Sequence, residues 1–249
     1  MARIKFMNTE IDNLTMEETL VEIDRLIQEN NNSYVVTPNV DHIMQLEKGG
    51  KLVEIYRDAN LILADGKPLI WISKWYGTPI KEKISGSDLF PLVCQMAGEK
   101  NYKMFFLGAA EGVAKKAAKN LMQRYKGLNV VGTYSPPIGF ENSDVEMARI
   151  KKMIRELQPH ILVVCLGCPK QETFIYNNRK ELGVPISLGL GASLDFEAGN
   201  IKRAPKWMSD HGLEWLYRIT QDPKRLAKRY LIDDMKIFRL AVKYKRKMK

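Results

Sequence analysis

Short apolar runs alternate with amphipathic stretches over most of the chain, and this alternation limits the folds open to it. Each apolar run spans four to six residues, which suits a buried strand better than a helix, and most runs end at a glycine, a proline or a polar residue. Strands that alternate with helices form mainly parallel sheets with helices on both faces, so we predict a Rossmann-like α/β domain. The predicted strands are 34–37, 61–64, 103–107, 129–133, 161–166 and 186–190.

Helices are predicted for the stretches between these strands. Thr15 and Glu18 form a capping-box pattern that begins the first of them. The predicted helices are 15–29, 39–58, 67–76, 87–98, 111–125, 143–157 and 169–180. In open α/β sheets the ligand lies beyond the carboxyl ends of the strands, so residues that directly follow strands are the candidates for a functional site.

The excess positive charge of the chain is confined to its C-terminal end. The net charge is +10, yet residues 1–201 hold 24 basic and 24 acidic residues, whereas residues 202–249 hold 15 basic and 5 acidic residues. We therefore predict an α/β domain over 1–200 and a basic helical appendage over 201–249, with helices at 207–220 and 223–247. The second helix is amphipathic, basic and aromatic, which is typical of a helix lying on an anionic membrane surface. Packing on the chain's own domain would explain its apolar residues equally well, but not its charge.

The sequence favours a cytoplasmic protein. Acidic residues stand where a signal peptide would need its apolar stretch, and the longest apolar runs, such as 161–166, are far short of the roughly 20 residues that a membrane-spanning helix requires. The cysteines, Cys94, Cys165 and Cys168, give no even disulfide framework. Cys165 and Cys168 would supply two of four zinc ligands, so we expect a buried strand cysteine and a loop cysteine instead.

A set of short motifs occurs in a fixed order between Tyr34 and Tyr230. They are Thr37-Pro38-Asn39, Ala64-Asp65-Gly66, Gly86-Ser87-Asp88-Leu89, Gly167-Cys168-Pro169-Lys170-Gln171-Glu172, Asp195-Phe196, Arg203-Ala204-Pro205-Lys206-Trp207, Gly212-Leu213-Glu214-Trp215-Leu216-Tyr217-Arg218, Pro223-Lys224-Arg225-Leu226 and Arg229-Tyr230. No single motif is diagnostic, but the ordered set closely resembles the WecG/TagA/CpsF family of bacterial glycosyltransferases.

The resemblance implies a Rossmann-like core and a C-terminal appendage that docks on the inner face of the cell membrane and closes over the site. It implies transfer of N-acetylmannosamine from a UDP-sugar donor, with inversion, to undecaprenyl-pyrophosphate-linked N-acetylglucosamine in teichoic acid or related cell-surface polysaccharide synthesis. It also implies catalysis without a metal or other cofactor. Use of another UDP-hexose or a uronic acid donor for exopolysaccharide is the alternative within the family, and a homo-oligomer stays open.

Asp65 is the candidate catalytic base. Displacement at an anomeric carbon needs one base to take the proton of the acceptor hydroxyl, and Asp65 follows a predicted strand and matches the base proposed for the family. The ordinary pKa of aspartate is about 3.9, so partial burial would suit it to this role. On the residues alone, Asp65 and Gly66 could equally make a turn or cap a helix. Thr37 and Asn39 follow the first strand as neutral hydrogen-bonding residues suited to sugar hydroxyl and acetamido groups.

Positive side chains are expected to stabilise the diphosphate of the departing UDP. The sequence contains no Asp-x-Asp motif to hold a metal, and the nearest pattern, Asp144-Val145-Glu146, falls on a predicted helix. Preorganised donors of this kind are worth about 3–4 kcal/mol each. Lys83 stands where the family commonly has arginine and lacks the forked grip of a guanidinium. The predicted substrate-binding residues are Lys83, Gly108, Gln171, Asp195, Arg218, Arg225, Lys228 and Arg229, although the four in the appendage would also fit a solvated basic face.

Two other function classes fit parts of the sequence. A nucleic-acid-binding module would use the basic appendage as its arm, but the body is neutral and carries no recognised nucleic-acid motif. A nucleotide-dependent oxidoreductase could be built on the same class of sheet, but the glycines at 108 and 112 lack the spacing of a dinucleotide fingerprint. The sequence therefore favours a membrane-peripheral transferase with no nucleic-acid partner.

Overall fold

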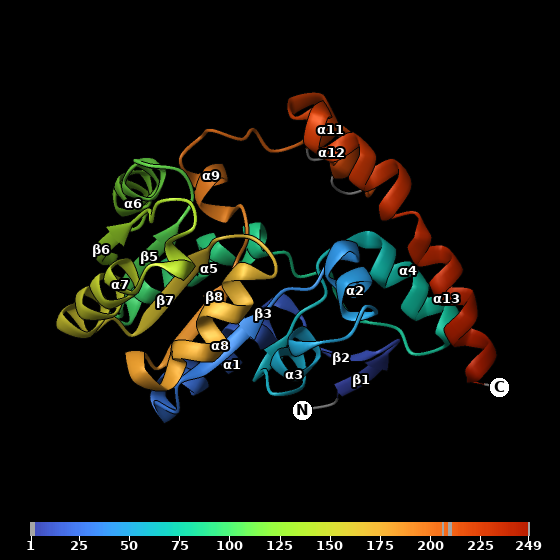
Figure 1. Cartoon of the computed structure of the whole chain (residues 1–249), viewed down its shortest axis with the longest axis horizontal. Coiled ribbons are helices and arrows are strands. Elements are labelled where there is room, and N and C mark those ends of the chain that lie inside the picture. Colours follow the sequence, from blue (N-terminus) through green and yellow to red (C-terminus); the bar gives the residue numbers. More distant parts are fainter. Residues whose placement is uncertain (1–2, 206, 209–210, 249) are drawn as a thin grey trace.

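A sheet of six parallel strands forms the centre of the molecule (Figure 1). The computed structural model describes residues 3–205, 207–208 and 211–248, and of Arg225 the backbone alone. The strand order is β4-β3-β8-β7-β5-β6, and every neighbouring pair is parallel. The strands are β3 (Ser33–Val36), β4 (Leu61–Ile62), β5 (Lys103–Gly108), β6 (Asn129–Tyr134), β7 (Ile161–Cys165) and β8 (Ile186–Gly189). The predicted strands and the Rossmann-like fold class are confirmed, with strand ends displaced by at most two residues.

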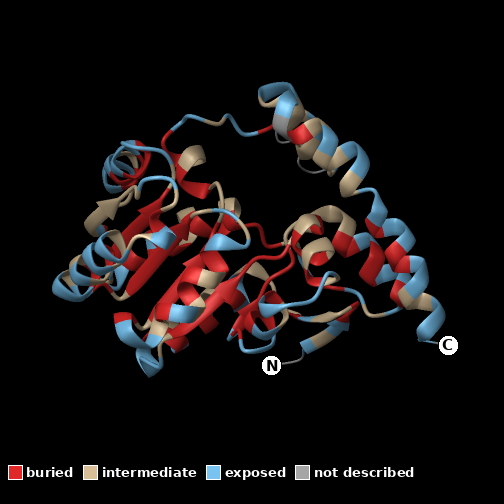
Figure 2. Ribbon diagram, in the orientation of Figure 1, coloured by how far each residue is buried: buried red, intermediate tan, exposed pale blue. Residues whose placement is uncertain are grey.

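Helices cover both faces of this sheet, because its central strands are apolar on both sides. In β7, Ile161 and Val163 belong to one apolar cluster, whereas Leu162 and Val164 belong to the other. The first face is covered by α1 (Met16–Glu29), α5 (Gly86–Glu99), α6 (Val113–Arg124) and α9 (Ser193–Glu197). The second is covered by α2 (Val40–Leu46), α3 (Lys51–Arg57), α4 (Lys67–Tyr76), α7 (Asp144–Leu157) and α8 (Lys170–Leu182). Figure 2 shows the buried sheet between these two layers. A short 3₁₀ helix, η1 (Phe140–Asn142), precedes α7.

An N-terminal β-hairpin, β1 (Arg3–Phe6) and β2 (Thr9–Asp12), extends the second layer and was missed by the sequence analysis. Asp12 links it to the main sheet, since its carboxylate accepts a 2.8 Å hydrogen bond from the backbone N–H of Ile62 and a 3.0 Å hydrogen bond from the Arg3 guanidinium. The hairpin therefore secures β4, the edge strand that precedes Asp65.

The prediction of a single helix over 39–58 is wrong for the middle of that range. The structure has two helices there, α2 and α3, separated by a turn. Gly49 and Gly50 adopt φ angles of +78° and +85°, in the left-handed region that glycine tolerates and that cannot continue a right-handed helix. The break separates α2, which follows β3 in the chain, from α3, which packs against α8.

The basic appendage is helical, as predicted, but its second helix is interrupted. Its elements are α11 (Glu214–Gln221), α12 (Pro223–Lys228), the π-helical segment η2 (Arg229–Asp233) and α13 (Lys236–Lys247), so the continuous helix predicted for 223–247 is corrected. The predicted helix at 207–220 falls in part outside the described residues. Its described helical residues are 207–208 and, after a turn at 211–212, those of α11 from Glu214 onward.

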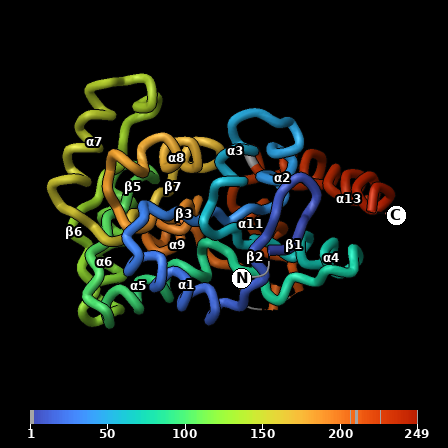
Figure 3. Tube along the Cα trace, turned by 90° about the horizontal axis from the view of Figure 1, so that it is seen from below, coloured from blue at the N-terminus to red at the C-terminus, as the bar shows by residue number. Residues whose placement is uncertain are grey.

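The appendage arches from α9 across to the opposite side of the body, and α13 lies beside α4 (Figures 1 and 3). The Tyr76 hydroxyl on α4 donates a 2.9 Å hydrogen bond to the Ala241 carbonyl, and Lys243 and Tyr244 both contact Glu47 at the end of α2 at 2.8 Å. Within the described residues, no helix combines the length and apolarity needed to cross a bilayer. The C-terminal helix of the appendage, α13, thus rests on the second face of the body.

Candidate active site

The carboxyl ends of β3 and β4 bring Thr37, Asn39 and Asp65 together, as the sheet order requires. The backbone N–H of Asp65 donates a 2.8 Å hydrogen bond to the Pro38 carbonyl, between the other two residues. Thr37 is buried, and its hydroxyl donates a 3.1 Å hydrogen bond to the Gly189 carbonyl at the end of β8. Thr37 therefore ties neighbouring strand ends together, while Asp65 and Asn39 are only partly buried and remain accessible to a ligand.

Asp65 has the electrostatic properties of a base that works near neutral pH. Burial raises the pKa of its carboxyl group to about 6, with the charge of Lys83 acting to lower it and that of Glu214 acting to raise it. Glu214 is the first residue of α11, so the appendage lies near enough to influence the charge of the catalytic candidate. Gly212 lies against α4, since a Cβ added there would stand 3.0 Å from Cγ of Lys67. The site is thus built by the body and the appendage together.

Lys83 is held by the first turn of α5 and does not stand free. Its ammonium group lies 2.7 Å from the Asp88 carboxylate, which Arg203 of the appendage also binds. Burial acts to raise the pKa of Asp88, but Lys83, Ser85 and Arg203 together hold it at about 2. The predicted diphosphate role of Lys83 thus stays a prediction, and the arrangement adds Arg203, which the sequence analysis did not select.

Two further predicted residues lie in supporting positions. Gln171 is buried, and its amide accepts a 3.0 Å hydrogen bond from the Gly191 N–H while donating a 2.8 Å bond to Glu172. Gly108 ends β5, where an added Cβ would lie 2.3 Å from the Cys165 carbonyl, so this position requires glycine. The substrate-binding role predicted for both residues stays a prediction. In the sheet, β3, β8 and β7 lie between β4, which precedes Asp65, and β5, which Gly108 ends.

Asp195 lies on α9, shortly before the start of the appendage in the sequence. Its backbone carbonyl accepts hydrogen bonds of 3.0 and 3.3 Å from the N–H groups of Asn200 and Ile201, and so shapes the chain where it leaves the body. The role predicted for its carboxylate, holding a ribose or a sugar hydroxyl, stays a prediction.

The cations of the appendage divide into those that face the body and those that face solvent. Arg229 Nη2 lies 3.4 Å from Oδ1 of Asn39 and 3.6 Å from the Asp41 carboxylate. Arg218 stacks over the Phe196 ring at 5.8 Å and lines a cavity of about 130 Å³. Lys228 is exposed, and the side chain of Arg225 lies outside the described residues. The prediction that all four grip one diphosphate therefore stays a prediction for each.

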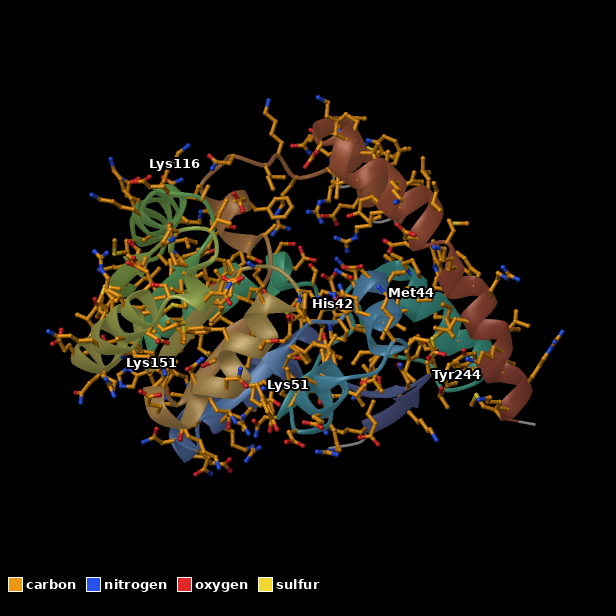
Figure 4. The ribbon with its side chains drawn as sticks, in the orientation of Figure 1. His42, Met44, Lys51, Lys116, Lys151 and Tyr244 are labelled. Carbon is orange, nitrogen blue, oxygen red and sulfur yellow. The ribbon has the colours of Figure 1, made fainter. Side chains whose placement is uncertain are left out.

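A buried polar cluster that the sequence analysis missed lies beneath Asn39. His42 follows Asn39 on α2, close to the centre of the molecule (Figure 4), and its Nε2 is 3.4 Å from the fully buried carboxylate of Glu172. Burial acts to raise the pKa of Glu172, but hydrogen bonds from His42 and Gln171 hold it below its ordinary value. The capping pattern of Asn39 with the third residue of its helix was the available sequence signal for His42.

The same cluster offers the one group of potential metal ligands found among the described residues, namely His42, Cys168 and Glu172, whose ligand atoms lie within 4.8 Å of one another. Burial, reinforced by the charge of Glu172, raises the pKa of the Cys168 thiol far above its ordinary value. Cys165 is buried in β7 and Cys168 lies in the following loop, and both are free, as expected.

The sequence is similar to those of known proteins over most or all of its length. The family model described as "Glycosyl transferase WecG/TagA/CpsF family" matches residues 4–249. The chain is 31% identical over 199 residues to a protein of Bacillus spizizenii, and the match covers 80% of this chain and 75% of the relative. It is 33% identical over 172 residues to a protein of Bacillus subtilis, where the match covers 69% of this chain and 65% of the relative. It is 29% identical over 251 residues to a protein of Staphylococcus aureus, covering 100% and 95%. All three relatives are named N-acetylglucosaminyldiphosphoundecaprenol N-acetyl-beta-D-mannosaminyltransferase.

Proposed function

The chain belongs to the WecG/TagA/CpsF family of glycosyltransferases, and on that premise we propose that it transfers N-acetylmannosamine from UDP-N-acetylmannosamine to undecaprenyl-diphosphate-linked N-acetylglucosamine. The observation that carries the proposal is Asp65, a partly buried carboxylate at a strand end that faces the basic appendage. The names of the relatives support the sugar and the acceptor.

The proposed reaction is a single inverting displacement. The acceptor hydroxyl oxygen attacks the anomeric carbon and its proton passes to the Asp65 carboxylate, while the bond from that carbon to the diphosphate breaks and UDP leaves with the electron pair. A base with a pKa of about 6 is largely ionised at neutral pH, yet it is more basic than an ordinary aspartate. Asn39 and Thr37 border the position that the sugar would occupy.

We propose that cationic side chains stabilise the leaving diphosphate without a divalent metal. Arg229 and Arg203 both lie on the appendage and reach carboxylates at the edge of the site, Asp41 and Asp88. A diphosphate bound at this edge of the site would offer the two guanidinium groups oxygen acceptors in place of these carboxylates. Closure of the appendage over the site would then also bring in the positive charges that stabilise the leaving diphosphate.

An anionic membrane surface is the proposed docking partner. On α4, Trp71 and Trp75 are each 50% exposed, and on α13, Phe238 and Val242 are 42% and 41% exposed. Lys245 lies 6.0 Å from the Trp75 ring and, at helical spacing, shares a flank of α13 with Phe238 and Val242. These five residues, the α4–α13 surface, combine interfacial aromatic groups with positive charge, which suits the inner face of a cell membrane.

The donor and the metal independence are tested by one assay. Purified protein is given a short-chain lipid-diphosphate N-acetylglucosamine acceptor and a panel of UDP-sugars, with and without EDTA. We expect turnover with UDP-N-acetylmannosamine that EDTA leaves unchanged. Preference for another UDP-hexose would overturn the proposed sugar, and loss of turnover with EDTA would overturn the arginine account.

Binding to vesicles tests the proposed docking surface. We expect the full chain to bind phosphatidylglycerol vesicles and to release as salt rises from about 0.1 to 0.5 M, because surface charges are then screened. The double variant Trp71→Ala/Trp75→Ala should bind about tenfold or more weakly, since it loses two half-exposed indoles. Ile138→Ala/Val145→Ala, which removes exposed apolar groups elsewhere on the body, is the matched control. Equal binding by both double variants would remove α4 from the docking surface.

A further inference from the structure

Three buried polar atoms near the start of α8 have no hydrogen-bond partner among the described residues. They are Nε2 of His42, Oε2 of Glu172 and the hydroxyl oxygen of Tyr56. Glu172 is 0% exposed, Tyr56 is 1% exposed and His42 is 7% exposed. Burial, followed by the charges of Glu172 and Cys168, raises the pKa of the Tyr56 hydroxyl, so that hydroxyl lies near both side chains. Buried polar atoms in folded proteins almost always have a partner, and three such atoms in one place indicate a bound group that satisfies them.

The Cys168 thiol adds a soft ligand to this cluster. Its sulfur, a ring nitrogen of His42 and a carboxylate oxygen of Glu172 all lie within 4.8 Å of one another. Nitrogen, oxygen and sulfur ligands bind zinc at about 2.0–2.3 Å, so ligands of a tetrahedral ion lie about 3.3–3.8 Å apart. The 3.4 Å between Nε2 of His42 and Oε1 of Glu172 already falls in this range. One ion between the three side chains can therefore reach all of them.

Neighbouring residues hold two of these ligands as an outer coordination shell would. Nδ1 of His42 faces Asn39, 2.8 Å from its side-chain oxygen and 3.4 Å from its backbone nitrogen, so Nε2 is the ring nitrogen turned toward Glu172. Oε1 of Glu172 accepts a 2.8 Å hydrogen bond from Gln171, and Oε2 is the oxygen left for a further partner. Histidines and carboxylates that bind metals are usually oriented by contacts of this kind.

The choice of ion follows from the ligand types and from charge. Sulfur together with imidazole and carboxylate suits Zn²⁺, whereas Mg²⁺ and Ca²⁺ prefer oxygen ligands. A zinc ion with one thiolate, one carboxylate and a neutral imidazole has no net charge, which a buried site accommodates at least cost. Burial and the charge of Glu172 raise the pKa of the Cys168 thiol in the absence of an ion. A bound zinc ion acts in the opposite direction, because it deprotonates the thiol that binds it, and the proton passes to solvent.

We propose that this cluster is a structural zinc site whose protein ligands are His42, Cys168 and Glu172. The fourth position belongs to the Tyr56 hydroxyl or to a water molecule. The ion joins the first turn of α2 to the first turn of α8, and so fixes the two helix starts that carry predicted site residues. It does not touch the leaving diphosphate, because it lies beneath the site against a carboxylate that is 0% exposed. The inference therefore does not depend on the proposed function.

Zinc content and thermal stability test the proposal on the full chain. The protein is purified without chelator, dialysed against zinc and then against metal-free buffer. We expect one equivalent of zinc by elemental mass spectrometry, and its removal by prolonged dialysis against a strong chelator should lower Tm by about 5–10 °C. Cys168→Ala and His42→Ala should bind zinc at least about 100-fold more weakly, since loss of an outer-shell partner alone costs 10- to 100-fold.

The neighbouring cysteine supplies the matched control. Cys165→Ala removes a buried free cysteine at the end of β7 and should keep its zinc. A wild-type protein that holds no zinc after this treatment, or a Cys168→Ala protein that holds as much as the wild type, would overturn the proposal.

A cobalt spectrum tests the coordination even if the ligand variants fail to fold. Co²⁺ in place of zinc absorbs visible light strongly in tetrahedral surroundings, and a thiolate ligand adds charge-transfer absorption in the near ultraviolet. We expect both features in the wild-type protein and in Cys165→Ala. A wild-type spectrum without the thiolate feature would show that the ion binds elsewhere, and would overturn the site.

Zinc content measured after the EDTA turnover assay keeps this site separate from the proposed function. We expect the buried ion to remain bound through the short exposure to EDTA. Loss of turnover with zinc retained would count against the arginine account alone, and an inactive protein that holds one equivalent of zinc would count against the proposed function alone. An active protein that binds no zinc would overturn the zinc site and leave the proposed function standing.

Discussion

The body and the appendage of this glycosyltransferase are held in place by different forces. In the body, every residue of β3, β7 and β8 is buried, and the strand residues pack into two apolar clusters. In the appendage, α11 and η2 contribute no buried residue, and α13 contributes Ile237, Leu240 and Ala241. With Ala204 and Leu226 these are the buried apolar residues of the described appendage. Apolar burial stabilises the body throughout, whereas the appendage buries few apolar side chains and adds polar contacts to them.

Those polar contacts connect cations of the appendage to carboxylates of the body. Arg203 pairs with Asp88, Arg229 approaches Asp41, and Lys243 binds Glu47. Ion pairs with this degree of exposure contribute only about 0–1 kcal/mol each, so the appendage is held weakly by its charges. An anionic ligand or lipid can therefore replace the carboxylates at small cost. The difference between the regions suits the proposed division of roles, in which a rigid body carries the candidate base and an adjustable appendage supplies charge.

The prediction with the largest expected effect tests whether a residue of the body supplies the catalytic base. Asp65→Asn should lower kcat about 10²- to 10⁴-fold, because the acceptor hydroxyl loses its base. Binding of UDP, measured by calorimetry, should be retained. An Asp65→Asn protein that turns over at the wild-type rate would exclude Asp65 as the base.

The same variant carries its own folding control. The pKa of Asp65 is raised in the folded protein, so the ionised carboxylate costs stability as pH rises through about 6. Asparagine resembles the protonated form, and Asp65→Asn should melt at a higher temperature than the wild type at pH 8. That difference should disappear toward pH 4, where the wild-type carboxyl group is protonated in the folded state and increasingly so in the unfolded state.

A second prediction tests whether the appendage completes the site. Arg229→Ala should lower kcat on the order of 100-fold, by analogy with the loss of one preorganised donor to a developing anion. Arg229→Lys keeps the charge without the fork and should recover part of the rate. Lys224→Ala removes an exposed cation of the adjacent helix and serves as the control. Equal effects of Arg229→Ala and Lys224→Ala would mean that the appendage contributes only general positive charge.

The contrast between the regions also explains what the sequence could predict. The strands were recognisable because apolar burial on both faces leaves continuous runs such as 161–166, and the sheet then placed Thr37, Asn39 and Asp65 at one edge. The break at Gly49 and Gly50 was visible in principle, since two consecutive glycines rarely continue a helix. The helical spacing of apolar residues continues on both sides of these glycines, and a single helix was therefore predicted.

What could not be predicted depends on pairing between distant segments. The partner of His42 is Glu172, 130 positions away by number, and neither residue carries a local signal of the contact. The η2 interruption likewise lies in a stretch whose helical periodicity is unbroken, and its Arg229 turns toward Asn39 of the body. Burial is encoded in local pattern, whereas the polar contacts that build the site are set by the tertiary arrangement.

The smallest effect is a shift in pH dependence, and it measures how the two regions act on one carboxyl group. Asp65 must be ionised to act as a base, so kcat/KM should fall about tenfold per pH unit below about 6 and level off above it. Glu214 of the appendage raises the pKa of Asp65, whereas Lys83 of the body lowers it. Glu214→Gln should therefore move the acidic limb to lower pH, and Lys83→Met should move it to higher pH. Glu54→Gln, an exposed carboxylate on α3, should leave the limb in place. If Lys83→Met moves the acidic limb and Glu214→Gln does not, α11 stands away from Asp65 during turnover. The appendage would then act through Arg229 alone.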